Sequence, residues 1–249
     1  MEGFVFWITA LIAAVAVGMG KGGLPMVALL AVPLLSLVIS PVAAAGLLLP
    51  VYVASDVFGL YAYRRAFDRR VLAIMLPGMV AGVGFGWATA HLVPESAVTV
   101  LVGMIGVVFA LNRLLRRGPE GAARVARVLP GLFWGAVAGF TSFVSHAGGP
   151  PYQVYTLPLG MPKVVFAGTA TIAFAIVNAV KLVPYYALGQ LSADNLHVAA
   201  LLAPVAAGAV FLGVWLVNRL SEVLFFRIVT WALLVISLKL VWDGMQPVF

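Results

Sequence analysis

The sequence contains no cysteine and few charged residues. Without cysteine the chain can form neither a disulfide nor a thiolate metal site, and cysteine usage does not indicate its cellular compartment. Only 9% of the 249 residues are charged, against about 25% in a typical soluble domain. Hydrophobic residues make up 63% of the chain, and the mean hydropathy is +1.12. A soluble fold is therefore excluded, and the composition predicts an all-α integral membrane protein in a lipid bilayer.

Several motifs of enzymes and pumps are also missing. The sequence has no GxxxxGK[ST] loop, which excludes a nucleotide-driven pump within this chain, and it has neither an HExxH nor a GxSxG pattern. An intramembrane enzyme that uses Asp56, Ser145 and His146 stays an alternative, but catalysis needs a nucleophile and a base that converge. We therefore expect no enzyme activity, no catalytic residue, no metal site and no cofactor, apart from a proton or cation that could be coupled to transport.

The basic residues are placed unevenly along the chain. The net charge is +7, and nine of the fifteen Lys and Arg residues lie in the segments 64–70 and 113–127. Both segments separate apolar runs, so the charge indicates membrane topology rather than nucleic-acid binding. If both segments are cytoplasmic, the linker at 118–127 is cytoplasmic, and the loop at 91–95 and both termini lie outside.

Apolar segments long enough to cross a bilayer follow one another along the chain. Plain spans are predicted at 41–63, 71–91, 96–115, 163–188, 195–217 and 222–242. Two further segments, 4–38 and 130–160, are interrupted by glycine and proline. The arms beside each break hold roughly 11–17 residues, which at ~1.5 Å per residue is short of a ~30 Å hydrocarbon core. We favour hairpins that enter the membrane and turn back, with two short tilted spans as the alternative.

The two halves of the chain resemble each other. Segment 22–25 falls on segment 148–151 with an offset of 126, and Asp56 falls on Asn178 with an offset of 122. The loop after the first plain span, at 64–70, is basic. Its counterpart in the second half, at 189–195, has no Lys or Arg. This exchange of charge is typical of inverted repeats, whose halves are related by an axis in the membrane plane. The predicted organisation is a first repeat, a basic linker and a second repeat, at 1–117, 118–127 and 128–249.

Each break has a sequence suited to anion binding. The first holds Lys21, Gly22 and Gly23, the second holds Gly148 and Gly149, and proline follows in both. Glycine permits unusual backbone angles, and proline fits the first turn of a helix. A helix that begins there would direct free N–H groups and its positive end at the break. Two such ends near the membrane midplane, together with the Lys21 charge, predict a transporter site for a small anion.

The second break follows a Gly-Phe run within segment 139–151, GFTSFVSHAGGPP. Together with the first break, the duplicated halves and the basic linker, this run resembles the sulfite exporter TauE/SafE family over essentially the whole chain. The resemblance implies a secondary transporter that exports sulfite or a C2 organosulfonate across a bacterial plasma (inner) membrane. Breaks in that family often carry three consecutive glycines. This chain has Lys21 in the first break and His146 and Ala147 in the second, so its choice of substrate could differ.

Four polar residues in or beside the apolar spans are candidate site residues. Lys21 could bind the substrate anion, the role we favour, or snorkel to the interface. Asp56 could couple a proton or cation, pair with Lys21, or lie at the cytoplasmic interface near Arg64. Asn178 could hydrogen-bond substrate oxygens or join helices. Lys181 could line the pathway, although we favour a stem that snorkels outward.

The polar residues before the second break are further candidates. Thr141, Ser142 and Ser145 could donate hydrogen bonds to sulfonate oxygens or bond only the preceding helical turn. His146 could bind an anion when protonated, carry a coupled proton, or make a structural hydrogen bond. A passive anion channel stays an alternative, because it could use the same helix ends. The expected partners are a small anion and the bilayer, and a homodimer stays open.

Overall fold

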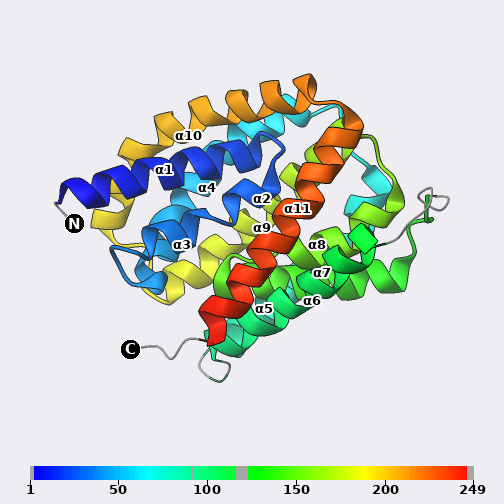
Figure 1. Cartoon of the computed structure of the whole chain (residues 1–249). Helices are drawn as coiled ribbons and strands as arrows, with labels where there is room; N and C mark the ends of the chain where they lie inside the picture. Colours follow the sequence, from blue (N-terminus) through cyan, green and yellow to red (C-terminus); the bar gives the residue numbers. More distant parts are fainter. Residues whose placement is uncertain (1–2, 91, 93, 116–122, 246–249) are drawn as a thin grey trace. The chain divides into compact units, whose positions relative to one another are not determined.

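The computed structural model describes residues 3–90, 92, 94–115 and 123–245, and within these ranges it is helical with no β-strand (Figure 1). The helices form two compact units, which are residues 1–67 with 164–220 and residues 68–163 with 221–249. We refer to them as unit 1 and unit 2. The all-α prediction is confirmed.

Unit 1 is built around the first broken segment. Its helices are α1 (Phe4–Lys21), α2 (Pro25–Ala28), α3 (Ala31–Leu35), α4 (Pro41–Tyr63), α9 (Lys163–Ala187) and α10 (Ala193–Arg219). Helix α1 packs along α10, the blue and orange ribbons in Figure 1, and α4 contacts both. Alanine, leucine and valine side chains of these helices form a continuous core, which includes Ala10, Val17, Leu47 and Leu202.

Unit 2 is built around the second broken segment. Its helices are α5 (Arg69–Ala88), α6 (Glu95–Leu115), α7 (Val128–Ser145), α8 (Gly149–Thr156) with the 3-10 turn η1 (Leu157–Leu159), and α11 (Glu222–Met245). Helix α7 packs against α5, and α6 packs against α11.

Glycines four residues apart bring α5 and α7 into backbone contact, as small residues commonly do between membrane helices. A Cβ on Gly139 would lie 1.9 Å from the Met79 carbonyl oxygen, and one on Gly82 would lie 2.0 Å from that of Ala136. Only glycine permits so close an approach at these two positions.

The helices match the predicted spans closely. All six plain spans are single helices, and both predicted breaks interrupt a helix. Helices α1 and α7 are longer than predicted, at 18 residues each. They are among seven helices in the described part of the chain that are long and apolar enough to cross a membrane, whereas the returning arms are short.

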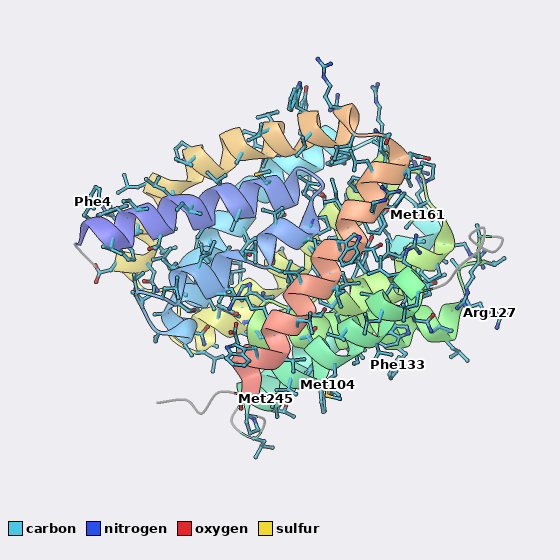
Figure 2. All side chains as sticks on the ribbon, viewed as in Figure 1. Phe4, Met104, Arg127, Phe133, Met161 and Met245 are labelled. Atoms are coloured by element: carbon cyan, nitrogen blue, oxygen red, sulfur yellow. The ribbon has the colours of Figure 1, made fainter. Side chains whose placement is uncertain are left out.

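Large apolar side chains cover much of the outer surface. Phe4 is 81% exposed, Phe133 61% and Met245 71%, and these side chains point away from the helices in Figure 2. In water such a surface would be unfavourable, whereas acyl chains solvate it well. The chain is a multi-pass membrane protein. Its orientation, and its assignment to a bacterial inner membrane, stay predictions.

The two compact units do not follow the predicted repeats. Each unit takes helices from both halves of the sequence, so the boundaries at 117 and 128 are not boundaries between units. Because inverted repeats can exchange helices as they pack, the division into 1–117 and 128–249 stays a prediction. Half of the linker at 118–127, residues 118–122, lies outside the described residues, as do positions 91 and 93 of the predicted outer loop.

Candidate functional site

The first break lies where α1 meets α10. Helix α1 ends at Lys21, and Gly22 touches the backbone of α10. A Cβ on Gly22 would lie 2.3 Å from the Val210 carbonyl oxygen and 2.7 Å from Gly213 Cα. Two glycines therefore face each other, which holds the end of α1 against α10 in the interior of unit 1.

Two tyrosines of α4 fix the chain on both sides of the turn. Gly23 has φ of 103°, a left-handed conformation that favours glycine. The Tyr63 hydroxyl donates a hydrogen bond to the Gly22 carbonyl at 2.6 Å. The Tyr52 hydroxyl donates to the Ala28 carbonyl at 2.9 Å, on the returning arm. Carbonyls that the broken helix leaves unpaired are thereby satisfied.

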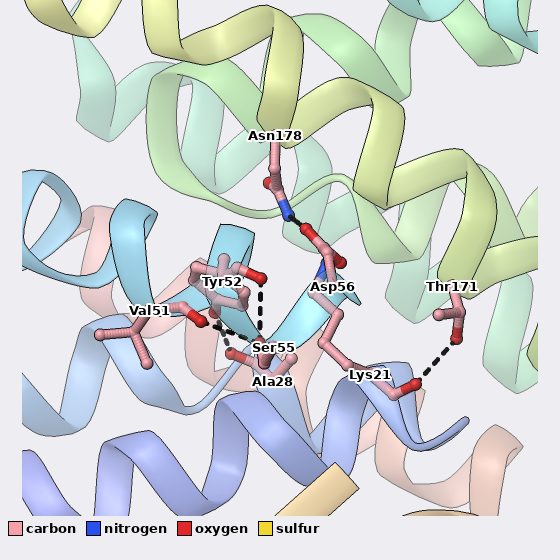
Figure 3. A network of polar contacts seen from close by, with 8 residues as sticks. All are labelled: Lys21, Ala28, Val51, Tyr52, Ser55, Asp56, Thr171 and Asn178. Carbon is pink, nitrogen blue, oxygen red and sulfur yellow. Dashed lines mark hydrogen bonds and ion pairs between the residues drawn. The ribbon is translucent and has the colours of Figure 1, made fainter. Parts of the chain in front are cut away.

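A buried ion pair forms at the break (Figure 3). Lys21 Nζ lies 2.6 Å from Asp56 Oδ1, and each residue is only 4% exposed. Asn178 Nδ2 donates a hydrogen bond to the other carboxylate oxygen of Asp56 at 2.9 Å. The Lys21 ammonium also lies 5.3 Å from the ring centre of Tyr52, within range of a cation–π interaction. The pairing of Asp56 with Lys21, one of the alternatives that the sequence left open, is present in the structure, and a coupling role of Asp56 stays a prediction.

A second buried amine completes this cluster. Lys181 is fully buried in α9, three residues after Asn178, whose amide bonds Asp56. Its Nζ lies 5.4 Å from the ring centre of Tyr185. The interpretation that Lys181 snorkels outward is wrong, because its position on α9 turns the stem into unit 1. Snorkelling of Lys21 is excluded by the same burial, whereas the depth of Asp56 in the bilayer stays a prediction.

Helix α9 also reaches the backbone of the break. The Thr171 hydroxyl donates to the Lys21 carbonyl at 3.1 Å. A Cβ on Gly59 of α4 would lie 2.7 Å from Thr171 Cγ2 and 3.0 Å from the Lys21 carbonyl oxygen. Gly59 thus leaves the space in which the three helices α1, α4 and α9 meet at Lys21.

The second break ends its helix differently. Helix α7 ends at Ser145, and His146 takes a left-handed conformation with φ of 53°. The amides of His146 and Ala147 donate back to the carbonyls of Ser142 and Thr141, both at 3.2 Å. A left-handed residue often ends a helix in this way, although glycine is the usual one.

The hydroxyls near the second break bond to the backbone. Thr141 Oγ1 lies 2.8 Å from the Val137 carbonyl and 3.2 Å from the Ala147 carbonyl, and it is buried. Ser145 Oγ donates to the Thr141 carbonyl at 3.3 Å. These contacts agree with the local-bonding alternative for Thr141 and Ser145. Ser142 is buried beside them, and its predicted role as a ligand stays a prediction, as does that of His146.

The helices that begin at the breaks are short, so their positive ends are weaker than the sequence led us to expect. Helix α2 has four residues, a single turn, whereas α8 has eight. A macrodipole needs several aligned turns, so α2 contributes little positive potential. At the first break the full charge of Lys21 takes the place of the dipole. The amides of Gly148 and Gly149, at the start of α8, stay predicted ligands.

The structure brings together some of the predicted site residues. Lys21, Gly22, Gly23, Asp56, Asn178 and Lys181 gather in unit 1, and Thr141, Ser142, Ser145, His146, Gly148 and Gly149 gather in unit 2. That the two breaks share one site stays a prediction. Sequence reasoning missed Tyr52, Tyr63 and Thr171 as site residues. Tyr63 falls on Tyr185 in the repeat alignment, a signal that could have identified it.

The donor set of the cluster in unit 1 is mainly amines, an amide and hydroxyls. No group of three His, Cys, Asp or Glu side chains suited to a metal ion occurs in the described residues. The cluster in unit 1 instead presents these groups around one carboxylate. Such a donor set suits a small anion, because ammonium and N–H groups donate to anionic oxygens.

Comparisons with known proteins agree with this chemistry. The family model described as Sulfite exporter TauE/SafE matches residues 7–240. No curated protein and no solved structure matches the chain. The resemblance found in the sequence is confirmed over nearly its full length. The chain belongs to the sulfite exporter TauE/SafE family, whose members are membrane transporters and not enzymes.

Proposed function

We propose that this protein is a secondary transporter that exports a small sulfur-containing anion such as sulfite or a C2 organosulfonate. The proposal places Lys21 as the group that binds the anion. The observation that carries it is the ammonium of Lys21, 4% exposed at a helix break within the membrane-spanning part of the chain. A buried charge in a membrane-spanning segment is costly even when it is paired, so it is a functional-site candidate by default.

In this proposal Asp56 controls whether the Lys21 ammonium is available to a substrate anion. In the structure the Asp56 carboxylate forms an ion pair with the Lys21 ammonium, at 2.6 Å. A substrate anion must displace that carboxylate or share the ammonium with it. Asp56 is therefore the proposed coupling group, because a released carboxylate can take up a proton or bind a cation.

The packing supports an inverted repeat. Helix α1 packs on α10, and α7, its counterpart in the second half, packs on α5, the counterpart of α10. Asp56 and Asn178 occupy matching positions of the two halves and hydrogen-bond each other. This contact between matching residues supports the proposed relation of the two halves.

The test uses purified protein in liposomes loaded with sulfite or a C2 sulfonate. We expect saturable efflux by the wild type and loss of efflux in Lys21→Ala and Lys21→Met. Lys239→Ala is the matched control, because Lys239 also pairs with an aspartate, Asp243, but is exposed on α11. An unfolding profile in detergent identifies variants that fail to fold.

Two results would change this proposal. Wild-type efflux by folded Lys21→Ala contradicts the role of Lys21. Flux that rises linearly with concentration and ignores ion gradients favours a passive anion channel over a secondary transporter. A proton-sensitive dye inside the liposomes reports whether efflux in the wild type moves protons and whether Asp56→Asn stops this movement.

A further inference from the structure

We infer that the buried cluster of Lys21, Asp56 and Lys181 selects substrates by charge, and that it binds a singly charged anion in preference to a neutral or doubly charged molecule. This inference rests on the proposed function, because it concerns the substrate class of the same site.

Ionisable groups in the interior of unit 1 are few. Lys21, Asp56 and Lys181 are 4%, 4% and 0% exposed. The other Lys, Arg, Asp, Glu and His side chains that the structure describes in this unit are all exposed, and they are Arg64, Arg65, Asp194, His197 and Arg219. The charge of the interior is therefore set by two amines and one carboxylate.

The helices packed around Asp56 differ in the ionisable and polar groups that they bring to it. Helix α1 brings Lys21, and α9 brings Lys181 and the neutral amide of Asn178. Helix α4 itself brings Tyr52. Helices α3 and α10 also pack on α4. The described part of α3 has no ionisable residue, and those of α10 lie at its two ends.

We take both amines as protonated and the carboxylate as ionised, so that the cluster carries one positive charge. A singly charged anion brings the occupied site to neutrality. A neutral molecule leaves the positive charge uncompensated, and a doubly charged anion leaves a negative one unless Asp56 takes up a proton. An uncompensated charge in a region of low dielectric constant is strongly unfavourable, so neutrality is the preferred bound state.

The size of this effect is measurable. At an effective dielectric constant of about 20, an uncompensated unit charge a few Å away changes binding by roughly 100-fold. Partial compensation by water and by protein dipoles reduces this value. We therefore expect a preference of about 10-fold or more between anions that differ by one charge.

Three two-carbon sulfonates provide matched probes. Taurine, isethionate and sulfoacetate share the sulfonate and the two-carbon skeleton and carry an ammonium, a hydroxyl and a carboxylate group at the other end. At neutral pH they are a zwitterion without net charge, a singly charged anion and a doubly charged anion. Binding to the purified full-length protein is measured by calorimetry, and efflux is measured in liposomes. The wild type is expected to bind isethionate most tightly.

Variants that change the cluster charge then test the order of preference. Asp56→Asn keeps the size of the side chain, adds one positive charge and should favour sulfoacetate. Lys181→Met removes one positive charge and should abolish the preference for isethionate. The double variant returns the cluster to one positive charge and should restore that preference. Lys239→Met, on the exposed face of α11, should keep the wild-type order.

The outcomes separate the two proposals. If the wild type binds sulfonates but all variants keep one order of preference, or if the wild type prefers sulfoacetate, charge selection by this cluster is wrong and the transport function stands. If the wild type neither binds nor moves sulfite or any of the sulfonates, the proposed function itself is wrong. Restored binding by the double variant shows that the two substitutions together leave the protein folded, and an unfolding profile in detergent identifies any single variant that fails to fold.

Discussion

The two helix breaks end a membrane helix by different means. At the first break, charge and close backbone contact hold the turn, with Lys21 paired to Asp56 and Gly22 against Gly213. At the second break, the turn is closed locally by a left-handed His146 and by Thr141, whose hydroxyl contacts the Ala147 carbonyl. Both turns have local backbone bonds and a left-handed residue, and the first break is in addition held by partners distant in the sequence. Changes at the first break should be more damaging and more specific for function.

The largest effect is expected when the buried carboxylate is removed. Asp56→Leu leaves the Lys21 ammonium buried without its partner, which should lower the free energy of unfolding by about 3–5 kcal/mol. Asp243→Leu, in the exposed pair on α11, should change it by less than about 1 kcal/mol. Unfolding in detergent, followed by tryptophan fluorescence, measures both values. Equal effects at the two pairs would show that burial does not distinguish them.

A smaller loss is expected where the backbones touch. Gly22→Ala places a Cβ within 2.3 Å of the Val210 carbonyl oxygen, so α1 and α10 must separate. The expected cost is about 1–3 kcal/mol, together with a loss of transport as Lys21 shifts. Gly208→Ala in α10 is the control, since no atom lies within 4 Å of its added Cβ, and it should be neutral or stabilising. An unchanged unfolding midpoint in Gly22→Ala would rule out the tight contact.

Single hydrogen bonds at the two breaks permit a direct comparison. Tyr63→Phe removes the bond to the Gly22 carbonyl, and Thr141→Val removes the hydroxyl near the Ala147 carbonyl. Each should cost about 1 kcal/mol of stability. Only Tyr63→Phe is expected to raise KM for efflux, because its partner adjoins Lys21. A raised KM in folded Thr141→Val would instead support Thr141 as a substrate ligand.

The smallest effect is expected at His146, and it has the opposite sign. Glycine adopts the left-handed conformation more easily than histidine, so His146→Gly should raise the stability by up to about 1 kcal/mol. His146→Val should lower the stability, because a β-branched residue is strained at this φ. If His146→Gly keeps its stability but loses transport, His146 has a functional role beyond the turn.

Much of the fold could be predicted because lipid imposes simple rules on sequence. The plain span predicted at 41–63 is α4 with the same limits, and the breaks fall at Lys21–Gly23 and before Gly149. Apolar length and glycine-proline interruptions are local properties of a sequence. The alignment of Asp56 with Asn178 also followed from sequence, and the two prove to be hydrogen-bonded.

The environment of each ionisable side chain was harder to predict. Sequence reasoning left the pairing of Lys21 open among several interpretations, and it favoured the wrong one for Lys181. A lysine stem can reach either the interface or the interior, and the helix rotation that decides between them depends on packing. The roles of Tyr63 and Thr171 were missed for the same reason, since both bond to carbonyls of a distant turn.

The sequence by itself determined that this is a helical membrane protein with two broken segments in similar halves, because these features depend on composition and spacing. Only the tertiary structure decided that one carboxylate and two amines share a buried place. Asp56 of α4 pairs with Lys21 of α1 and accepts a hydrogen bond from Asn178 of α9, and Gly59 of α4 leaves room for α1 and α9 to approach. Charges that repel or attract over a few Å act only after packing has set those distances.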